Sequence, residues 1–517
     1  MIRVKRQQLF NPPGQHGRRP FEGGTPASCR LTRCEWPKPG TSRRSGGSAV
    51  RAGGAIVALA ATGLLVAVVA SVALCANAQP FLQTIRTNGP TANRLNVVIL
   101  SEGYTSTQLA QFLVDATNTV DTILSHPPYA EYSNYVNAFA IKVASDQSGS
   151  DHPGQSITNS TYFNSTYDLG NYFVTIPPDA TGQGRVDALL QTFMPQCHLS
   201  ILLVNDLTPG GSDGFNLTAI VSIGAVAAEA GMGQPAILTH ETGHVLANLG
   251  DEYTTEYPGF PDIEEPNTTR ETNRAAIKWN AWISTNTPVP TPNSYGDGII
   301  GLFEGAHYHS TGWYRPQLNC AMGSFGVPFC AVCREALVLA IYREVRPVDA
   351  FWPASTNLSV STTQALSFGL TLLQPATHNL SVQWFTNGVP YSGATNSTFT
   401  LLPRSLSDGS NWVAARVKDD TPWVRTDSLN LLSQTVTWAL NVNLPQLRLD
   451  SPTKLPGGRF AFRVVGTASQ GVVIQSSTNL LSWLRLTTNS LVAGQFWYTN
   501  SQAGASDWTF YRAVTPP

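Results

Sequence analysis

Charge is scarce in this chain: Asp, Glu, Lys and Arg make up 13% of its 517 residues, and the formal net charge is −1. This balance gives no broad positive field of the kind that attracts nucleic acid, so we expect no nucleic-acid partner. The sequence also lacks low-complexity linkers and repeats of solenoid length. Because single cores rarely grow beyond a few hundred residues, we expect about two to four globular domains.

The first 78 residues differ from the rest. Residues 1–51 are basic, and an apolar run from Ala55 to Leu74 follows them and closes with Ala76-Asn77-Ala78. A basic flank, an apolar run and a small-x-small cleavage site are typical of a secretory signal peptide. We therefore predict a secreted, extracellular protein that begins at Gln79. The apolar run is also long enough to span a bilayer, so we expect membrane or cell-surface attachment only if it is retained.

Cysteine is also sparse: seven cysteines beside 43 glycines and 35 prolines indicate a loop-rich globular protein rather than a small disulfide scaffold. Four cysteines follow the signal, and in an exported chain they permit two disulfides with three pairings. They are Cys197, Cys320, Cys330 and Cys333. Cys330-Ala-Val-Cys333 also has the spacing of half a structural zinc site. Since the chain contains one such pair, we favour disulfides.

From Asn93 onward, strand-like and helix-like segments alternate. Apolar residues recur at helical spacing from Leu109 to Leu124, and short apolar runs predict buried strands on either side of this helix. The predicted strands are Leu95–Leu100, Val136–Ala144, Leu199–Val204 and, at the sheet edge, Leu217–Ile223. Strands that alternate with helices favour an α/β fold around a twisted sheet.

The composition changes near Val348, where helical periodicity ends and Ser, Thr, Asn and β-branched residues prevail. Val382-Gln-Trp384, Asn387-Gly388 and the run Val413–Val417 are typical of an immunoglobulin-like sandwich with Trp384 in its core. We therefore predict four parts. They are a basic region with a signal peptide at 1–78, an α/β domain at 79–348, an immunoglobulin-like sandwich at 349–440, and a small β domain at 441–517.

The predicted helix after Pro235 contains His240-Glu241-Thr242-Gly243-His244. Residues four apart on a helix share one face, ~6 Å apart along the axis, so His240 and His244 can each direct an imidazole nitrogen to one zinc ion. Glu241 lies about 100° round the helix and can reach a water on that ion without being a ligand. Apolar neighbours indicate a buried helix, in which paired histidines beside a glutamate are unfavourable without a partner. We therefore predict a metal site rather than a surface helix with incidental histidines.

Asp251 is the first candidate for a third ligand. On an unbroken helix it would lie ~16 Å from His240 and ~10 Å from His244 along the axis, too far for one ion. If Asp251 binds zinc, the helix must therefore end before it. Asn248 and Gly250 are residue types that accept the left-handed conformation that ends helices, and this break supports Asp251 as a ligand.

His240-Glu-Thr-Gly-His244 followed by Leu249-Gly-Asp-Glu-Tyr253 resembles the motif of the bacterial IgA-peptidase family of zinc metallopeptidases. Other blocks support the resemblance, which covers Asn93 to Arg346. Asn96–Tyr104 resembles the family's opening strand and turn. The family's closing segment has its likeness in three blocks, Gly312–Pro316, Asn319–Met322 and Phe329–Glu335. The family takes its name from antibody cleavage by one member, and nothing in this sequence extends that substrate to this chain.

The resemblance implies a metzincin-like zinc metallopeptidase domain, with a twisted sheet, an active-site helix and Met322 in a turn beneath the zinc. All-β sandwich domains would follow it. Metzincins usually place a glycine three residues after the second histidine and the third ligand six residues after it. This chain has Ala247 and Gly250 at those positions, with Asp251 one residue further on. Glu252 and His309 therefore stay open as alternative third ligands.

We expect one zinc ion with three protein ligands and one open position. Glu241 would take a proton from the activated water and pass it to the leaving amine. A tyrosine or arginine would stabilise the oxyanion, and Tyr308, Tyr314 and Arg315 are the candidates by sequence position. A Ca²⁺ ion is conceivable at the acidic residues Glu256, Asp262, Glu264 and Glu265. Their irregular spacing favours a solvated acidic loop instead.

Two functions remain open. The first is a secreted zinc endopeptidase, acting as a monomer on peptide bonds of extracellular proteins, with C-terminal β domains that position it on its substrate. The second is a non-catalytic binding or adhesion protein with a degenerate metal site. The intact pair of histidines with Glu241 favours the peptidase.

Overall fold

The computed structural model describes residues 79–171, 173–214, 217–224, 233–361, 364–501 and 508–516. The basic region and the signal peptide or anchor were predicted within 1–78, which lies outside the described residues. In the part of the chain that is described, no helix is both long and apolar enough to cross a bilayer.

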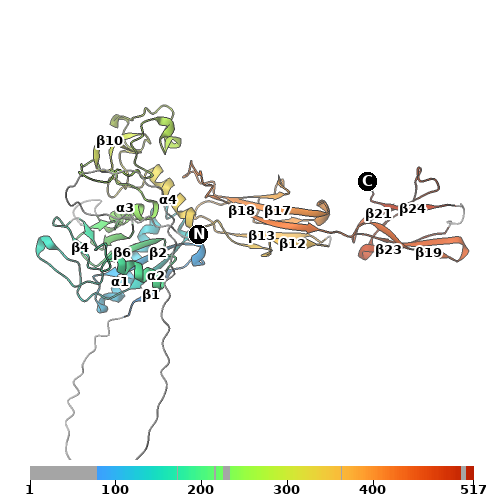
Figure 1. Ribbon diagram of the computed structural model, residues 1–517, viewed down its shortest axis with the longest axis horizontal. Helices are drawn as coiled ribbons and strands as arrows, with labels where there is room; N and C mark the ends of the chain where they lie inside the picture. Colours follow the sequence, from blue (N-terminus) through green and yellow to red (C-terminus); the bar gives the residue numbers. More distant parts are fainter. Residues whose placement is uncertain are drawn as a thin grey trace, which may run out of the picture. The chain divides into compact units, whose positions relative to one another are not determined.

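A six-stranded sheet organises the N-terminal part, with the strand order β1-β3-β2-β6-β8-β7 (Figure 1). The four central strands run parallel, and the two edge strands are antiparallel to their neighbours. The central strands are β3 (Val136–Lys142), β2 (Leu95–Glu102), β6 (Leu199–Val204) and β8 (Ala219–Ser222); the edges are β1 (Phe81–Arg86) and β7 (Gly211–Ser212). All four predicted strands form, but β8 is not the edge, because the two-residue strand β7 pairs with its outer side.

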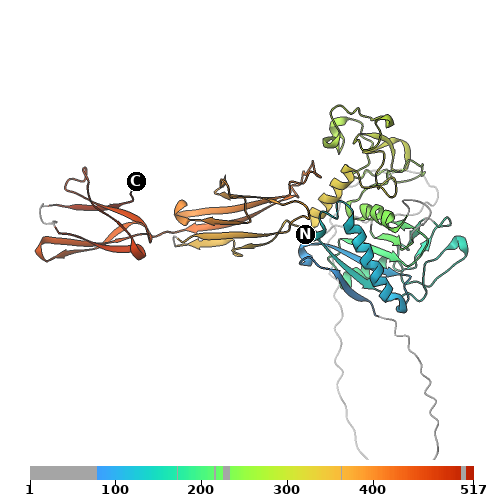
Figure 2. The ribbon, with the colours of Figure 1, turned by 180° about the vertical axis from the view of Figure 1, so that it is seen from behind.

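Helices cover both faces of this sheet, as parallel strands buried along their length require (Figures 1 and 2). Alternate residues of β2 point to opposite faces: Val97 and Ile99 join one core, whereas Val98 and Leu100 join the other. The first core also contains α1 (Leu109–Ser125), α3 (Gln234–Ala247) and α4 (Ala331–Glu344), and the second contains α2 (Gln183–Phe193). A short hairpin of β4 (Thr166–Tyr167) and β5 (Val174–Thr175) precedes α2.

The segment between α3 and α4 consists mainly of loops (Figure 2). Its regular elements are three single-turn 3-10 helices, η5 (Arg274–Ala276), η6 (Asn280–Trp282) and η7 (Asn293–Tyr295), and one hairpin of β9 (Phe303–Ala306) and β10 (His309–Arg315). The two turn residues of that hairpin, His307 and Tyr308, have φ values of 56° and 55°. Both residues of a tight type I′ turn need positive φ, which non-glycine residues adopt at a cost, so the fold constrains this turn strongly.

Two further sets of strands follow α4. In the first, the sheet β11-β13-β16 and the sheet β12-β18-β17-β14-β15 enclose one core. The strands of this pair are β11 (Val348–Trp352), β12 (Asn357–Val360), β13 (Leu366–Leu372), β14 (Ser381–Thr386), β15 (Val389–Pro390), β16 (Thr398–Leu401), β17 (Gly409–Lys418) and β18 (Ser433–Val442). Trp384 is fully buried there and stacks on Trp438 at 5.7 Å, so its predicted place in the core is confirmed. The immunoglobulin-like assignment stays a prediction.

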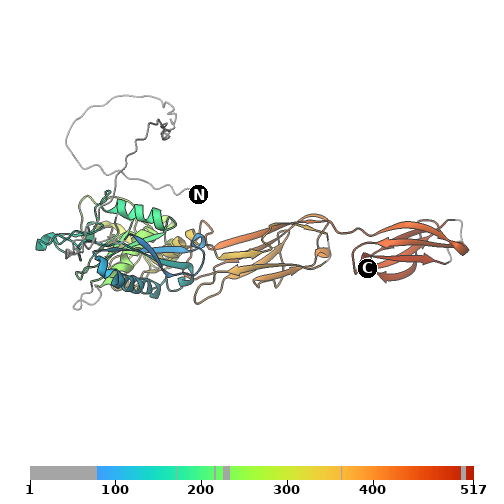
Figure 3. The same ribbon diagram turned by 90° about the horizontal axis from the view of Figure 1, so that it is seen from below.

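The last set of strands follows β18 (Figure 3). It has a smaller core, built from Phe462, Val464, Val472, Ile474 and Leu491. Two three-stranded sheets, β19-β20-β23 and β22-β21-β24, contribute to it. Their strands are β19 (Arg448–Leu455), β20 (Arg459–Val465), β21 (Gly471–Ser477), β22 (Leu484–Ser490), β23 (Gln495–Asn500) and β24 (Phe510–Val514). The predicted domain boundaries at 348 and 440 stay predictions.

The predicted fold class, an α/β metzincin-like domain followed by all-β sandwiches, is wrong for this chain. Within the described residues, four α-helices accompany twenty-four strands divided among seven sheets, so the structure is mainly β. The prediction extended the helical periodicity of the first segments across a region that folds as loops, 3-10 turns and a hairpin. The arrangement of the described elements also does not support the metzincin-like part of the prediction.

Candidate metal centre

Helix α3 ends where the sequence predicted a break. Pro235 stands in its first turn, the last helical residue is Ala247, and Asn248 adopts the left-handed conformation with φ 53° and ψ 42°. The Asn248 N–H donates to the His244 carbonyl at 2.9 Å, which closes the helix. Gly250 does not adopt the left-handed conformation. A Cβ at this position would lie 2.5 Å from Glu265 Oε2, so a glycine here leaves room for that carboxylate. The chain can therefore turn back toward the histidines within three residues.

Three side-chain atoms converge at this turn. His240 Nε2 lies 3.1 Å from His244 Nε2 and 3.0 Å from Asp251 Oδ1, and His244 Nε2 lies 3.4 Å from the same oxygen. Ligands placed ~2.0–2.1 Å from a tetrahedral zinc ion are separated by ~3.3 Å, so these distances match those of a metal site. The break in the helix thus has the effect that the sequence predicted, because Asp251 joins both histidines.

The outer atoms of the three side chains are held by hydrogen bonds. His240 Nδ1–H donates to the Ala321 carbonyl at 2.8 Å, and His244 Nδ1–H donates to the Leu249 carbonyl at 2.6 Å. Both Nε2 lone pairs are then available to a metal. The Tyr308 hydroxyl donates to Asp251 Oδ2 at 2.8 Å, whereas Asp251 Oδ1 is buried and has no hydrogen-bond partner. A buried, unpartnered carboxylate oxygen beside two imidazole nitrogens is a donor set that fits a divalent cation.

The charges of His240, His244 and Asp251 shift one another's pKa values. Burial disfavours the charged form of His244, but Asp251 outweighs it and raises the His244 pKa to about 9. Burial likewise disfavours the charged form of His240, but the nearby Asp251 carboxylate outweighs it and raises the His240 pKa. In turn, burial of Asp251 is outweighed by the attraction of His244 and His240, which lower its pKa. Positive charge is therefore stabilised at this point, whether protons or a metal ion supply it.

Glu241 lies beside this cluster and is 6% exposed. Burial raises its pKa to about 8, although His240 acts in the opposite direction. Strand β7 approaches it closely, because a Cβ on Gly211 would lie 2.9 Å from Glu241 Oε1. The carboxyl group thus occupies a narrow space between α3 and the edge strand of the sheet.

Met322 lies in a turn against the middle of α3. The amides of Gly323 and Ser324 both donate to the Cys320 carbonyl at 2.9 Å, which forms the turn. A Cβ on Gly243, between the two histidines, would lie 2.9 Å from Met322 Sδ. Met322 therefore supports the helix at its histidine-bearing turns, and the glycine of the motif permits that contact.

The other predicted candidates have different surroundings. Arg315 Nη1 donates to the carbonyl of Glu252 at 3.1 Å and to that of Gly305. Tyr314 exchanges two backbone hydrogen bonds with Thr269. His309 Nδ1 donates to the His307 carbonyl at 2.6 Å and stacks near Trp313, so it is not part of the cluster of His240 and His244. Glu252 belongs to a separate cluster with cysteines. Of the three predicted third ligands, the structure places Asp251 with the histidines.

The acidic loop considered for Ca²⁺ has protein partners. Glu256 accepts from the Ser310 amide at 2.8 Å, Asp262 pairs with Arg270 at 3.0 Å, and Glu264 pairs with Lys278 at 3.0 Å. Glu265 accepts from the Thr268 hydroxyl and lies 3.2 Å from His307 Nδ1. These carboxylates organise the loop between α3 and the hairpin.

The cysteines fall into two places. Cys320, Cys330 and Cys333 are buried together with Glu252, whereas Cys197 is half-buried against the core that contains α2. The disulfide pairings predicted among them stay predictions.

Sequence reasoning missed the groups that fix the cluster from a distance. Asn267 exchanges hydrogen bonds with both backbone groups of Gly250, at 2.7 and 2.8 Å, and donates to Glu252 Oε1 at 2.8 Å. The Ala321 carbonyl orients His240. Tyr253 places its ring 5.8 Å from that of His240. Tyr253 adjoins the motif and could have been singled out, but a backbone carbonyl and an isolated asparagine give no local signal.

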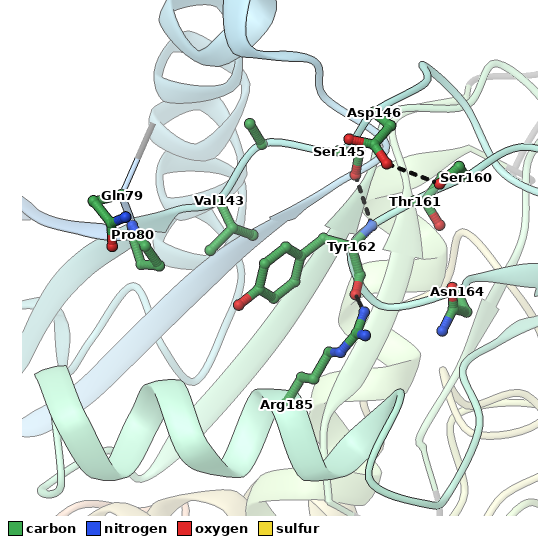
Figure 4. A pocket seen from close by; sticks show the side chains of 11 residues that line it. Gln79, Pro80, Val143, Ser145, Asp146, Ser160, Thr161, Tyr162, Asn164 and Arg185 are labelled. Carbon is green, nitrogen blue, oxygen red and sulfur yellow. Dashed lines mark hydrogen bonds between the residues drawn. The ribbon is translucent and has the colours of Figure 1, made fainter. Parts of the chain in front are cut away.

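A cavity of 340 Å³ lies elsewhere, between the start of β1, the loop after β3 and α2 (Figure 4). Its polar groups are largely paired with one another: the Tyr162 amide donates to Ser145 Oγ at 2.9 Å, Ser160 donates to Asp146 at 3.0 Å, and Arg185 donates to the Tyr162 carbonyl. No predicted site residue lines it.

Comparison with solved structures gives likenesses that cover parts of the chain. A beta-glucuronidase from Bacteroides uniformis is 11% identical over 40% of this chain and 29% of its own, with a TM-score of 0.13. A chain of the chaperone–tip adhesin complex of CFA/I fimbriae is 7% identical over 32% and 92%, with a TM-score of 0.13. A segment of titin is 9% identical over 39% and 72%, with a TM-score of 0.14. At these TM-scores the likenesses support no conclusion, and less than a third of the glucuronidase chain is spanned.

Among curated proteins there is no match to this chain. A protein family does match: residues 84–298 and 293–341 correspond to the family described as IgA Peptidase M64. The matched residues include α3, the loop that contains Asp251 and most of α4. The family consists of metallopeptidases, and the buried cluster of His240, His244 and Asp251 supplies donors for a metal. This chain therefore belongs to the IgA Peptidase M64 family of metallopeptidases.

Proposed function

We propose that this protein is a secreted zinc-dependent endopeptidase in which His240, His244 and Asp251 hold one zinc ion and Glu241 is the general base. The main support is the convergence of the two Nε2 atoms and Asp251 Oδ1 within 3.4 Å of one another. The same donor types also bind Fe²⁺ and other first-row metals, so the identity of the ion needs direct measurement.

The chemistry divides between the ion and the protein. A bound zinc ion supplies Lewis acidity, which polarises a peptide carbonyl and increases the acidity of water. Glu241 accepts the proton of the attacking water at its carboxylate and later delivers it to the leaving amine. The buried surroundings that raise the pKa of Glu241 to about 8 favour its protonated form between these two transfers.

Tyr308 acts in this proposal as a positioning residue. Its hydroxyl donates to Asp251 Oδ2, which turns the other oxygen of the carboxylate toward the histidines. Hydrogen bonds of this kind fix the orientation of metal-binding carboxylates. A transition-state role for Tyr308, Tyr314 or Arg315 requires contact with a substrate, and Arg315 is already engaged with the carbonyls of Glu252 and Gly305.

Secretion is part of the proposal and rests on the basic and apolar segments before Gln79. When the full chain is expressed with its N-terminus intact, we expect a monomer outside the cell whose first residue is Gln79. Sequencing of the N-terminus and size-exclusion chromatography test this. If the full-length chain is found in the membrane fraction, the N-terminal apolar segment is a membrane anchor rather than a cleaved signal peptide.

The decisive experiment compares the full chain with its Glu241→Gln variant. Zinc content and casein cleavage are measured before and after treatment with a chelator. We expect the variant to keep its zinc and to lose about 10²- to 10⁴-fold in cleavage rate, the usual contribution of a general base. Glu304→Gln, an exposed glutamate on β9, is the matched control and should cleave at the normal rate.

Two results would overturn the proposal. If the wild-type chain contains no zinc, the metal assignment is wrong. If the Glu241→Gln variant is fully active, Glu241 is not the general base. If zinc is bound but neither protein cleaves casein or any other protein offered, a secreted binding protein with a degenerate site becomes the better account.

A further inference from the structure

We propose that Glu252, Cys320, Cys330 and Cys333 form a second metal site, which holds a structural zinc ion. One ligand atom from each of the four residues lies within 4.8 Å of all the others, and all four residues are buried. For these three cysteines, a shared metal ion is the alternative to the disulfides favoured from the sequence.

The four residues come from three segments that meet at the start of α4. Cys330 caps the helix, Cys333 lies in its first turn, and Cys320 precedes the turn that contains Met322. Two residues separate Cys330 from Cys333, the spacing at which structural zinc sites present two thiolates from one turn. Glu252 comes from the loop after α3, one residue beyond Asp251.

The separations suit a tetrahedral ion. Cys320 Sγ lies 3.6 Å from Cys333 Sγ, and Cys333 Sγ lies 3.6 Å from Glu252 Oε1. With zinc–sulfur bonds of ~2.3 Å and zinc–oxygen bonds of ~2.1 Å, the edges of such a tetrahedron measure ~3.6–3.8 Å. Sulfurs joined in a disulfide would be ~2.05 Å apart.

Backbone N–H groups point at the sulfurs. The Cys330 amide donates to Cys320 Sγ at 3.3 Å, and the Cys333 amide donates to Cys330 Sγ at 3.5 Å. Such donors, together with the N-terminal end of α4, stabilise thiolates, which are the form that binds metal. The backbone is thus arranged for negative charge on sulfur before any ion binds.

Glu252 provides an independent sign of a missing partner. It is 2% exposed, its Oε1 accepts from Asn267 Nδ2 at 2.8 Å, and its Oε2 is buried without a hydrogen-bond partner. A buried carboxylate oxygen left in this state is unfavourable, because it has lost its water without gaining a partner. A divalent cation among the three sulfurs would remove this penalty and offset part of the negative charge of the four ligands.

Four buried protein ligands leave no open position, so this ion would be structural rather than catalytic. Its ligands join the segments that orient the first site. Ala321, between Cys320 and Met322, accepts the hydrogen bond from His240, and the Glu252 amide donates to the Met322 carbonyl at 2.8 Å. The second ion would thereby hold both Asp251 and the His240 acceptor in place.

The test is the zinc content of the full chain and three variants. We expect two zinc ions per wild-type chain, one in Cys333→Ser, one in His240→Ala, and two in Cys197→Ser, the control cysteine outside the cluster. Exchange with Co²⁺ gives a second readout that does not depend on activity. Thiolate-to-cobalt charge-transfer absorption should persist in His240→Ala and disappear in Cys333→Ser.

If Cys333→Ser fails to fold, the wild-type chain alone decides the question. Cysteine-reactive reagents should label Cys320, Cys330 and Cys333 in the native protein only after the chelator removes the second ion, as peptide mapping would show. A single zinc ion per chain with these thiols labelled at once would overturn the proposal. So would a disulfide among the three cysteines in the purified protein.

Discussion

Two candidate metal sites begin at neighbouring residues, Asp251 and Glu252, and they differ in almost every other respect. The first combines two imidazoles with a carboxylate whose side chain is 13% exposed. The second combines three sulfurs with a carboxylate that is 2% exposed. Three protein donors leave a position open for a substrate, whereas four donors fill a tetrahedron. If both sites bind a metal as proposed, donor count, more than the kind of metal, separates a reactive site from a structural one.

The largest effect on metal content and cleavage should come from neutralising the carboxylates of Asp251 and Glu252 one at a time. Asp251→Asn should lose the ion of the first site and reduce proteolysis by more than about 100-fold, because a direct ligand matters more than the outer partners that cost ~10–100-fold. Glu252→Gln should lose the other ion and keep the first. Metal content by mass spectrometry and casein cleavage rates check this. If both variants lose the same ion, the division into two sites is wrong.

Asn267 tests what the two sites share, since it bonds both backbone groups of Gly250 and the Glu252 carboxylate. Asn267→Ala removes three buried hydrogen bonds, and at roughly 1 kcal/mol each it should lower the free energy of unfolding by about 3 kcal/mol. Denaturant titration measures this, and both ions should be released more easily. Asn273→Ala, which removes a single cap on η5, should cost only about 0.5–1 kcal/mol and leave both ions in place.

Tyr308 should affect the first site alone. Tyr308→Phe removes the hydrogen bond to Asp251 and should weaken zinc binding or activity by ~10–100-fold without changing the sulfur-bound ion. Competition with a zinc chelator gives the affinity. Tyr257→Phe is the matched control, because Tyr257 packs 5.9 Å from the Tyr308 ring but is 62% exposed. Equal loss in both variants would mean that the aromatic packing matters and the hydroxyl does not.

His152 sharpens the comparison as a buried histidine that pairs with Asp206 and, within the described residues, belongs to neither cluster of metal donors. Burial opposes its charge, but hydrogen bonds to Asp206 at 2.8 Å and Asn171 at 3.0 Å raise its pKa in the folded protein. Because the His152 pKa is higher in the folded protein than in the unfolded chain, protonated His152 stabilises the fold. This stabilisation is complete at pH values below the unfolded-state pKa and is lost as the pH rises through the folded-state pKa. His152→Gln should therefore cost about 1.5 kcal/mol below pH ~6.5 and less at alkaline pH. Unfolding curves across that range measure the difference; a constant difference would contradict the ion pair.

Local patterns predicted much of the structure around the site. Short apolar runs gave β2, β3 and β6 with ends that agree within about two residues, the usual uncertainty of such boundaries. Asn248 ended α3 because its side chain tolerates the left-handed conformation, and that intrinsic preference is visible in the sequence. The spacing of His240 and His244 placed two donors on one face for the same local reason.

The remaining features depend on contacts between distant residues. Strand β7 is only Gly211-Ser212, too short for any alternation to show, and it displaced β8 from the sheet edge. The sequence placed Asp251 first but left Glu252 and His309 open. The contacts that position Asp251 and Glu252 come from Tyr308 and Asn267, which lie 57 and 15 residues away. The fold class failed similarly, since the loops between α3 and α4 have no periodicity from which to predict their path.

The hydrogen bond between His240 and Ala321 also has a consequence in time. Its two partners are 81 residues apart in sequence, and Asp251 is 57 residues ahead of Tyr308. A ribosome adds ~5–20 residues per second, so a growing chain contains the whole of α3 for several seconds before Ala321 exists. During that interval His240 lacks the acceptor that orients it, so a chain interrupted there has an incomplete first site. The first site is thus complete only once the chain has been synthesised at least as far as Ala321.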